Sequence, residues 1–159
     1  MIYRHHQADI LRYLFRRLGN EATAQDLTQQ VFLKAWQAIP RYRDRGRPLL
    51  AWLYTIARRQ VIDYARAAKP ARSLEGIEIG EPSRVEEQVI RAERQRQLRA
   101  ALERLSEDHR DVLILRFWLD KPAAEVGELM GRSAGAVRVL QLRALRALRQ
   151  ELEAQGVTG

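Results

Sequence analysis

This chain of 159 residues contains no cysteine, which excludes disulfide bonds and metal sites with thiolate ligands. It has only three histidines, and the adjacent His5 and His6 would point about 100° apart on a helix. No apolar run approaches the roughly 20 residues that cross a bilayer, and the N-terminus lacks the pattern of a secretory signal. We therefore expect a cytoplasmic protein with no metal ion and no membrane insertion.

The sequence also lacks the residue patterns on which most enzymes depend. It has no glycine-rich phosphate loop, so ATP-driven chemistry is not expected. The four serines (Ser73, Ser83, Ser106 and Ser133) fall at expected linker or helix-cap positions. The pair Glu86–Glu87 is typical of a solvated helix start, where acidic groups favour the helix dipole. We predict a protein that acts by binding, is not an enzyme and needs no cofactor.

Acidic residues are fewer than basic ones, and the formal net charge is +8. Residues 1–68 carry a net charge of +7, residues 69–83 of −1 and residues 84–159 of +2. A polyanionic partner such as nucleic acid is the simplest explanation for this excess. An anionic membrane surface is the competing explanation, but the basic helices lack the broad apolar face of an interfacial helix.

Apolar residues recur with a period near 3.6 along the whole chain, and no convincing strand alternation appears. Residues 69–83 are rich in proline, glycine and small or acidic residues, which predicts a flexible linker. We therefore expect an all-α fold with two small helical domains, residues 1–68 and 84–159, joined by this linker. In residues 1–68 we expect three helices: one ending at Leu18, one from a capping box at Thr23–Asp26 to Pro40, and one from Pro48 to about Arg66. In residues 84–159 we expect a helix from Ser83 to Arg104 and a helix from Ser106 that carries Val112, Leu113, Leu115 and Phe117. Two further helices are expected at 123–130 and 134–150.

Residues 123–149 are the most informative stretch, because they predict a helix, a tight turn and a basic second helix. Gly131 would supply the positive φ of a helix C-cap, and Ser133 would cap the next helix. From 134 to 150 there are four arginines and no acidic residue. This pattern favours a helix-turn-helix whose second helix enters the DNA major groove. The apolar residues that fall mostly on the opposite side of that helix are Val137, Leu140, Leu145, Leu148 and Leu152.

The alternative for this second helix is a surface helix whose arginines are merely solvated. An ordinary solvated face mixes positive and negative charges, whereas this one does not. Arg138, Arg143, Arg146 and Arg149 fall within an arc of roughly 140° around the helix, hereafter the basic arc. Val139 and Leu142 also lie inside it, where they gain nothing from water but could contact thymine methyl groups. We therefore predict that this helix binds DNA.

A second informative stretch, residues 41–66, combines arginines with aromatic residues. Four arginines occur in the loop 41–47, and Trp52, Tyr54 and Tyr64 follow on the next helix. Aromatic faces stack on unpaired bases while guanidinium groups neutralise phosphates, a combination typical of sites for single-stranded nucleic acid. The alternative is that the aromatic residues belong to the core, which is the commoner role for any one of them.

These stretches resemble two conserved regions of the sigma-70 family of RNA polymerase sigma factors. The absence of a folded segment between them is similar to the extracytoplasmic-function (ECF, group IV) subfamily. Family members often have several more residues before the first of these helices, which leaves the true start of the protein open. The matching stretches are 26–36 and 51–58 with Asp63 for region 2, and 105–117, 124–131 and 135–138 for region 4.

The resemblance implies an alternative sigma factor that binds core RNA polymerase and directs promoter recognition and transcription initiation. Region 2 would contact the β′ clamp helices, open the −10 element and hold its non-template strand, and region 4 would dock on the β flap and read the duplex −35 element. An anti-sigma factor is a further partner common in the family. The implied polymerase contacts are Asp26, Leu27, Gln29 and Gln30, the −10 contacts Arg43, Arg45, Arg47, Trp52, Arg58, Arg59 and Arg66, and the −35 contacts Ser133, Arg138, Val139, Leu142, Arg143 and Arg146.

The chain departs from the family pattern at several of these positions. Arg59 stands where asparagine is frequent, and Gln30 replaces a usual acid. Val139 and Leu140 stand where many members have Ser-Arg, so we expect a less polar reading of the −35 element. Two alternatives stay open at this point: a helix-turn-helix regulator, which leaves residues 26–66 without a purpose, and a helical protein-interaction module, in which the charge would be incidental.

Overall fold

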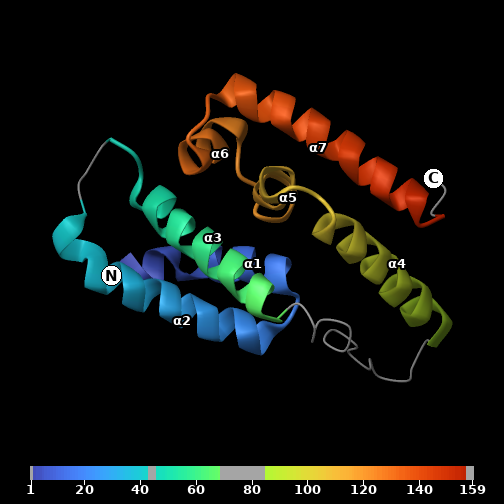
Figure 1. The fold of residues 1–159 in the computed structure, drawn as a ribbon, viewed down its shortest axis with the longest axis horizontal. Helices are drawn as coiled ribbons and strands as arrows, with labels where there is room; N and C mark the ends of the chain where they lie inside the picture. Colours follow the sequence, from blue (N-terminus) through green and yellow to red (C-terminus); the bar gives the residue numbers. More distant parts are fainter. Residues whose placement is uncertain (1, 43–45, 69–84, 157–159) are drawn as a thin grey trace.

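The structure is a computed structural model that describes residues 2–42, 46–68 and 85–156. These residues are almost entirely helical, and no strand occurs among them, which confirms the expected all-α fold (Figure 1). Arg43, Arg45 and the predicted linker 69–83 lie outside the described residues. The elements are α1 (Ile2–Leu18), α2 (Glu21–Ala38), the 3₁₀ turn η1 (Ile39–Arg41), α3 (Leu49–Ala68), α4 (Val85–Glu103), α5 (Glu107–Leu113), the π-helical turn η3 (Ile114–Trp118), α6 (Ala123–Met130) and α7 (Ala134–Ala154).

Helix α2 begins slightly earlier than the sequence indicated. The side chain of Asn20 accepts a hydrogen bond from the backbone N–H of Thr23 at 3.0 Å, so Asn20 is the N-cap residue and Glu21 the first helical residue. The capping box expected at Thr23–Asp26 is therefore wrong, because those residues already lie inside the helix. The helix ends where predicted, since Pro40 falls in the short turn η1.

The turn between α6 and α7 has the predicted geometry. Gly131 adopts a φ of +71° and ends α6 in the left-handed conformation. The hydroxyl of Ser133 accepts a hydrogen bond from the backbone N–H of Ala136 at 3.1 Å and caps α7. Ser106 caps α5 in the same way, through the N–H of His109 at 3.2 Å. The helix-turn-helix is thus fixed by residues within a few positions of each turn.

Helices α1, α2 and α3 pack against one another and form the N-terminal helical unit, hereafter region 2. Helices α4 to α7 form the C-terminal unit, hereafter region 4, in which α7 lies against α4, α5 and α6. Leu145, expected on the apolar side of the last helix, is exposed instead. Ala144 takes the core position beside Leu140, because Leu145 lies about 80° around the helix from Val137.

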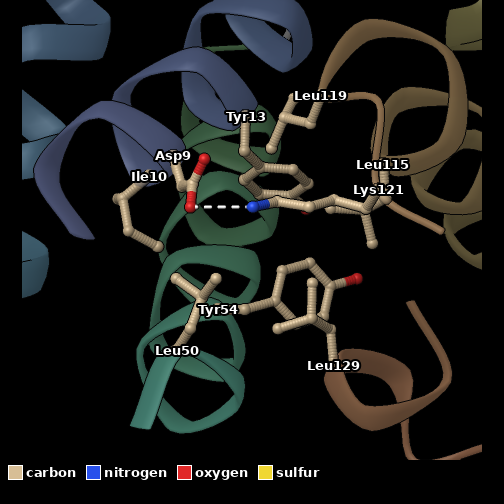
Figure 2. A pocket seen from close by; sticks show the side chains of 9 residues that line it. All are labelled: Asp9, Ile10, Tyr13, Leu50, Tyr54, Leu115, Leu119, Lys121 and Leu129. Atoms are coloured by element: carbon tan, nitrogen blue, oxygen red, sulfur yellow. Dashed lines mark hydrogen bonds and ion pairs between the residues drawn. The ribbon is translucent and has the colours of Figure 1, made fainter. Parts of the chain in front are cut away.

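The two units are in direct contact along a seam formed by α1 and α3 of region 2 and by η3 and α6 of region 4. Figure 2 shows a small pocket on this seam, with side chains from both units around it. At its edge the ammonium of Lys121 lies 3.0 Å from the carboxylate of Asp9. The residues lining the pocket are Asp9, Ile10, Tyr13, Leu50, Tyr54, Leu115, Leu119, Lys121 and Leu129.

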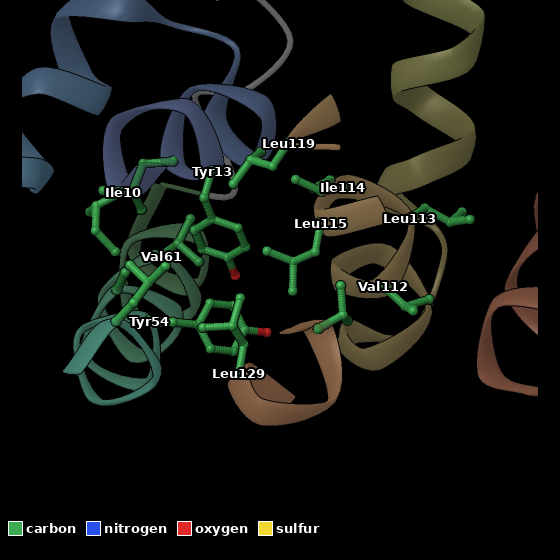
Figure 3. Close-up of a cluster of buried hydrophobic side chains, with 14 of the residues drawn as sticks. Ile10, Tyr13, Tyr54, Val61, Val112, Leu113, Ile114, Leu115, Leu119 and Leu129 are labelled. Atoms are coloured by element: carbon green, nitrogen blue, oxygen red, sulfur yellow. The ribbon is translucent and has the colours of Figure 1, made fainter. Parts of the chain in front are cut away.

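The apolar core continues across this seam. Figure 3 shows Ile10, Tyr13 and Tyr54 of region 2 facing Leu115 and Leu129 of region 4 within one buried cluster. The two units that the sequence predicts as domains on either side of a linker therefore share a buried surface. This contact determines which of the expected functional residues are accessible.

Candidate nucleic-acid and polymerase interfaces

The expected polymerase-binding residues lie on α2. Asp26, Gln29 and Gln30 are exposed on one side of the helix, where a partner can reach them. Leu27 is only 5% exposed and belongs to the core of region 2. Leu27 therefore positions the helix, and the predicted residues that a partner can contact directly are the polar ones, Asp26, Gln29 and Gln30.

Two large apolar side chains extend the same face of α2. Leu33, four residues after Gln29, is 57% exposed, and Trp36, seven residues after Gln29, is 73% exposed. A tryptophan side chain with so much exposed surface is removed from water only when a partner covers it. The sequence reasoning assigned neither residue a role, although both stand inside the stretch that resembles region 2.

Trp52, Arg59 and Arg66 form a stripe along α3, because they are spaced seven residues apart. Arg59 and Arg66 are exposed. Trp52 is half-buried, and its ring centroid lies 4.7 Å from that of Tyr42. Three of the expected −10 contacts therefore lie along one side of α3, about 10 Å from one to the next.

Arg47, which the sequence placed in the same DNA-binding set, is bound by region 4. Its Nε and Nη2 donate hydrogen bonds to the carbonyl oxygen of Glu128 at 3.2 and 2.8 Å, and Nη2 also donates to the carbonyl of Leu129 at 3.2 Å. These carbonyls belong to the last turn of α6, which has no helical partners for them and carries the negative end of the helix dipole. Arg47 thus caps a region 4 helix.

Arg58 is also bound by region 4, through a pair of aspartates. Its Nη2 lies 2.7 Å from Oδ1 of Asp108, and Arg132 approaches the other oxygen of Asp108 at 2.6 Å. Burial alone raises the pKa of Asp108, but the hydrogen bonds and charges of Arg58 and Arg132 outweigh burial and lower the pKa below its ordinary value. Asp108 is therefore a carboxylate that bridges two arginines from the two units.

Asp111, one turn further along α5, has no exposed surface and accepts hydrogen bonds from three region 2 side chains. Its Oδ1 accepts from the hydroxyl of Tyr13 at 2.9 Å and from Nη1 of Arg17 at 2.8 Å, and its Oδ2 accepts from the hydroxyl of Tyr54. Nε of Arg58 lies 3.5 Å from Oδ2. Both oxygens are thus saturated, as a buried carboxylate requires.

The ionisation of this cluster follows from its burial. Burial and the neighbouring charge of Asp111 raise the pKa of both Tyr13 and Tyr54 well above the usual value for a phenol. Burial by itself lowers the pKa of Arg17, but Tyr13, Asp111 and Glu107 reverse this effect and raise the pKa above its ordinary value. Burial also raises the pKa of Asp111, against the lowering effects of Arg17, Tyr54 and Arg58. The cluster therefore surrounds Asp111 with a charged arginine and two neutral phenols.

Tyr54 consequently has a structural role in this arrangement. It is buried, its ring packs edge-on against Tyr13 with centroids 5.2 Å apart, and its hydroxyl binds Asp111. The alternative that the sequence left open, a core residue and not a base-stacking one, is the one that the structure favours for Tyr54.

The exposed face of α7 carries the residues expected to read the −35 element. Arg138, Arg143 and Arg146 are exposed, as the sequence predicted. Val139 and Leu142 stand among them with half their surface exposed, at 50% and 51%. Ser133 is at the N-terminus of the helix, where its hydroxyl acts as the cap.

In the part of the chain that the structure describes, no group of three histidine, cysteine, aspartate or glutamate side chains is placed to hold a metal ion. None of the described helices is both long and apolar enough to span a bilayer.

The sequence reasoning missed the residues that join the two units. Tyr13, Arg17, Asp108 and Asp111 had no predicted role, because the members of this cluster lie up to 98 positions apart and follow no local pattern. A charged residue within an amphipathic helix gives no sign that it will be buried against a distant segment. Only the stretch 105–117 was singled out, for its likeness to region 4.

Comparison with known proteins agrees with both halves of the chain. The family profile described as Sigma-70 region 2 matches residues 2–70, and the profile described as Sigma-70, region 4 matches residues 101–150. The ECF RNA polymerase sigma factor SigD of Mycobacterium tuberculosis is 38% identical over 155 residues, which cover 92% of this chain and 73% of SigD. SigL of the same organism is 35% identical over 160 residues, which cover 99% of this chain and 90% of SigL.

The fold is also similar to those of solved sigma factors. CnrH, solved in complex with the cytosolic domain of CnrY, has a TM-score of 0.61 at 24% identity, with 96% of this chain and 86% of that chain covered. RpoE of Bartonella quintana, solved with the anti-sigma factor NepR, has a TM-score of 0.59 at 20% identity, with 96% and 94% covered. At these identities the likeness concerns the fold.

The chain belongs to the ECF family of RNA polymerase sigma factors. It is an alternative sigma factor that directs promoter recognition and transcription initiation, and the expectation drawn from the resemblance is confirmed.

Proposed function

We propose that this sigma factor reads the −35 element with α7, opens and holds the −10 element with α3, and binds core polymerase with α2. It does so in the cytoplasm and by binding alone, with no catalytic step of its own. The observation that carries the proposal is the basic face of α7, where exposed arginines surround two exposed apolar side chains on the second helix of a helix-turn-helix.

In region 4, Arg138, Arg143 and Arg146 neutralise phosphates or donate to base edges in the major groove. Val139 and Leu142 contact thymine methyl groups, so that part of the −35 reading is apolar. The Ser133 cap places backbone N–H groups at the helix N-terminus, where a phosphate is favoured.

In region 2, Trp52 stacks on an unpaired base of the non-template strand, with Arg59 and Arg66 of the same stripe on its phosphates. Arg47 and Arg58, with Arg43 and Arg45 of the preceding loop, complete the positive surface. The full set requires release of Arg47 and Arg58 from region 4, which now binds them.

Core polymerase binds the exposed face of α2 through Asp26, Gln29 and Gln30, with Leu27 holding that helix in the bundle. The β′ clamp helices are the partner that the family resemblance assigns to this face, and Leu33 and Trp36 enlarge it with apolar area. Region 4 docks on the β flap.

The functional units are residues 1–68 and 84–159, with 69–83 joining them along the chain. An anti-sigma factor is a further partner. RpoE of Bartonella quintana was solved with the anti-sigma factor NepR, and this chain has a similar fold.

The decisive experiment is reconstitution with core polymerase that lacks any sigma factor, followed by run-off transcription from a selected promoter library. Transcripts are expected with this protein as the sole sigma factor, and their absence from every template would overturn the proposal. A helix-turn-helix regulator, the rival function, would need a resident sigma factor in the same assay.

Two tryptophan variants assign the surfaces. Trp52→Ala is expected to reduce permanganate reactivity of the −10 thymines more than binding of the duplex promoter. Trp36→Ala is the matched control, because it removes an equally large side chain and is expected to weaken binding to core polymerase. Equal losses of opening and duplex binding with Trp52→Ala would assign Trp52 to the core alone.

A further inference from the structure

We propose that Asp63 of α3 selects a cytosine in the −10 element, by accepting a hydrogen bond from its exocyclic amine in the major groove. This inference rests on the proposed binding of the −10 element by Trp52, Arg59 and Arg66 of the same helix. It adds a choice of base, which stacking on an aromatic ring and pairing with phosphates do not make.

Asp63 stands on the side of α3 that carries the proposed DNA contacts. At about 100° per residue, it lies within about 60° of Trp52, Arg59 and Arg66 around the helix. Along the helix axis it lies about 6 Å after Arg59 and about 4.5 Å before Arg66. DNA that contacts both arginines therefore passes over the carboxylate of Asp63.

The distance between Trp52 and Asp63 separates their two contacts along the DNA. Asp63 follows Trp52 by eleven residues, which is about 16 Å along the helix axis. Stacked DNA advances about 3.4 Å per nucleotide, so this length spans about five nucleotides. The base that Asp63 reads can therefore stay paired while Trp52 holds an unpaired one. Only the major-groove edge of that paired base is then open to the carboxylate.

The carboxylate of Asp63 is exposed and has no hydrogen-bond or ion-pair partner among the residues that the structure describes. Arg59 stands four positions before it and Arg66 three positions after it. On α7 the same order and spacing gives an ion pair, because Nε of Arg149 lies 3.1 Å from Glu153. The aspartate side chain is one methylene shorter than glutamate and keeps its oxygens nearer the helix. Its acceptor oxygens are therefore available to a donor on the DNA.

A carboxylate matches one base in the major groove. Cytosine presents its N4 amine there, which is a donor with no acceptor beside it. Thymine and guanine present the carbonyl oxygens O4 and O6, and adenine places the acceptor N7 next to its N6 amine. An ionised carboxylate has only acceptors, so these three bases each bring an acceptor against it. Asp63 is the only acidic residue of α3, and its charge near the phosphates is unfavourable unless such a donor meets it.

The test is transcription by the reconstituted holoenzyme from templates with a randomised −10 region, each with a barcode in its transcribed part that is counted in the RNA. The unmodified protein is expected to favour cytosine about fivefold over the other bases at one position. Asp63→Ala is expected to lose this preference and to raise transcription from templates without the cytosine, because a negative charge near the phosphates is removed. Asp63→Asn is expected to turn the preference toward adenine, because an amide accepts from N6 and donates to N7.

A control variant and a modified base make this result specific. Glu21→Gln converts another exposed acidic residue of region 2 to its amide, on α2, and is expected to leave every base preference unchanged. N4-methylcytosine at the selected position keeps its pairing with guanine but loses the N–H that points into the groove, and should weaken promoter binding by the unmodified holoenzyme about fivefold. With 5-methylcytosine, which adds a methyl group and keeps that N–H, binding should not fall. Asp63→Ala should bind the two modified promoters equally.

Unchanged base preferences in both Asp63 variants would overturn the inference. An equal loss of transcription from every template would overturn it too, because the carboxylate would then act through the helix or a neighbouring arginine. If the unmodified protein supports transcription and Trp52→Ala impairs opening, the proposed function stands whichever result the Asp63 variants give. Absence of transcription from every template would instead reject the proposed function and this inference together.

Discussion

The hydroxyl of Tyr54, on α3, donates a hydrogen bond to the carboxylate of Asp111, on α5, across the contact between the two helical units. Tyr13 and Arg17 of α1 bind the same carboxylate at 2.9 and 2.8 Å. One acidic side chain of region 4 therefore organises three side chains of region 2. The contact between the two units thus surrounds a fully buried carboxylate of region 4 with side chains of region 2.

The first prediction concerns the ionisation of the two tyrosines. Because burial and Asp111 raise the pKa of Tyr13 and Tyr54, both phenols stay protonated in the native protein near pH 10. Tyr13→Phe and Tyr54→Phe are expected to leave the 295 nm absorbance titration of the native protein unchanged between pH 9 and 11. In guanidinium chloride, where the side chains are exposed, each variant should lose the signal of one tyrosine.

The same shifts set the pH dependence of stability. A phenol whose pKa is higher in the folded state stabilises the folded protein. This stabilisation is complete at pH values below the pKa of the phenol in the unfolded state, which is about 10, and it is lost as the pH rises toward the pKa in the folded state. The free energy of unfolding should therefore fall above about pH 10. A native titration in which either variant loses a full tyrosine signal near pH 10 would contradict this account.

The second prediction concerns Arg17. Arg17→Met keeps the length of the side chain but leaves the carboxylate of Asp111 without its closest positive charge, because the guanidinium at 2.8 Å is gone. Removing one partner of a buried ion pair is expected to cost about 3 kcal/mol in a urea titration. Arg12→Met on the exposed side of α1 is the control and should change stability by less than about 0.5 kcal/mol. Equal effects of the two variants would show that the pair is not formed.

The parts of the structure that the sequence predicted well are those set by near neighbours. The end of α6 at Gly131 and the cap at Ser133 depend on residues within one turn, so the pattern determines them. The exposure of Val139 and Leu142 follows from helical period alone. The capping box at Thr23 failed because another capping residue, Asn20, stands three positions earlier and accepts the backbone N–H of Thr23, which places Thr23 inside the helix.

The contact between the units had no such signal. Arg17 and Asp111 are 94 positions apart, and neither stands in a local pattern that marks it as buried. Whether Arg58 faces a phosphate or a carboxylate depends on how the units dock, which periodicity does not describe. The candidate DNA residues could therefore be chosen from the sequence, but not which of them region 4 covers.

The third prediction compares two glycines of the helix-turn-helix. Gly131 has a φ of +71°, and a Cβ there would meet only Nη2 of Arg47 at 3.9 Å, so Gly131→Ala is strained by its backbone and not by crowding. It should lower stability by about 1 kcal/mol. Gly135, in the first turn of α7, has open space around it, and Gly135→Ala should raise stability by about 0.5 kcal/mol. Thermal unfolding followed by circular dichroism measures both, and changes of the same sign would contradict the argument.

The fourth prediction tests apolar reading of the −35 element by Leu142, which is half exposed between the arginines of α7. A contact with a thymine methyl group is lost either when Leu142 is replaced by Ala or when that thymine is replaced by deoxyuridine, which lacks only the methyl group. In the reconstituted holoenzyme, each change alone should therefore weaken promoter binding about three- to tenfold. The two changes together should weaken binding no more than either change alone.

Leu145→Ala is the matched control for this cycle, because Leu145 is also an exposed leucine of α7 but lies outside the basic arc. It should leave both promoter binding and the effect of deoxyuridine unchanged. If the losses from Leu142→Ala and deoxyuridine simply add, the leucine does not touch that methyl group, and the arginines alone carry the sequence preference of the helix. A single shared loss would instead assign one base position of the promoter to one side chain.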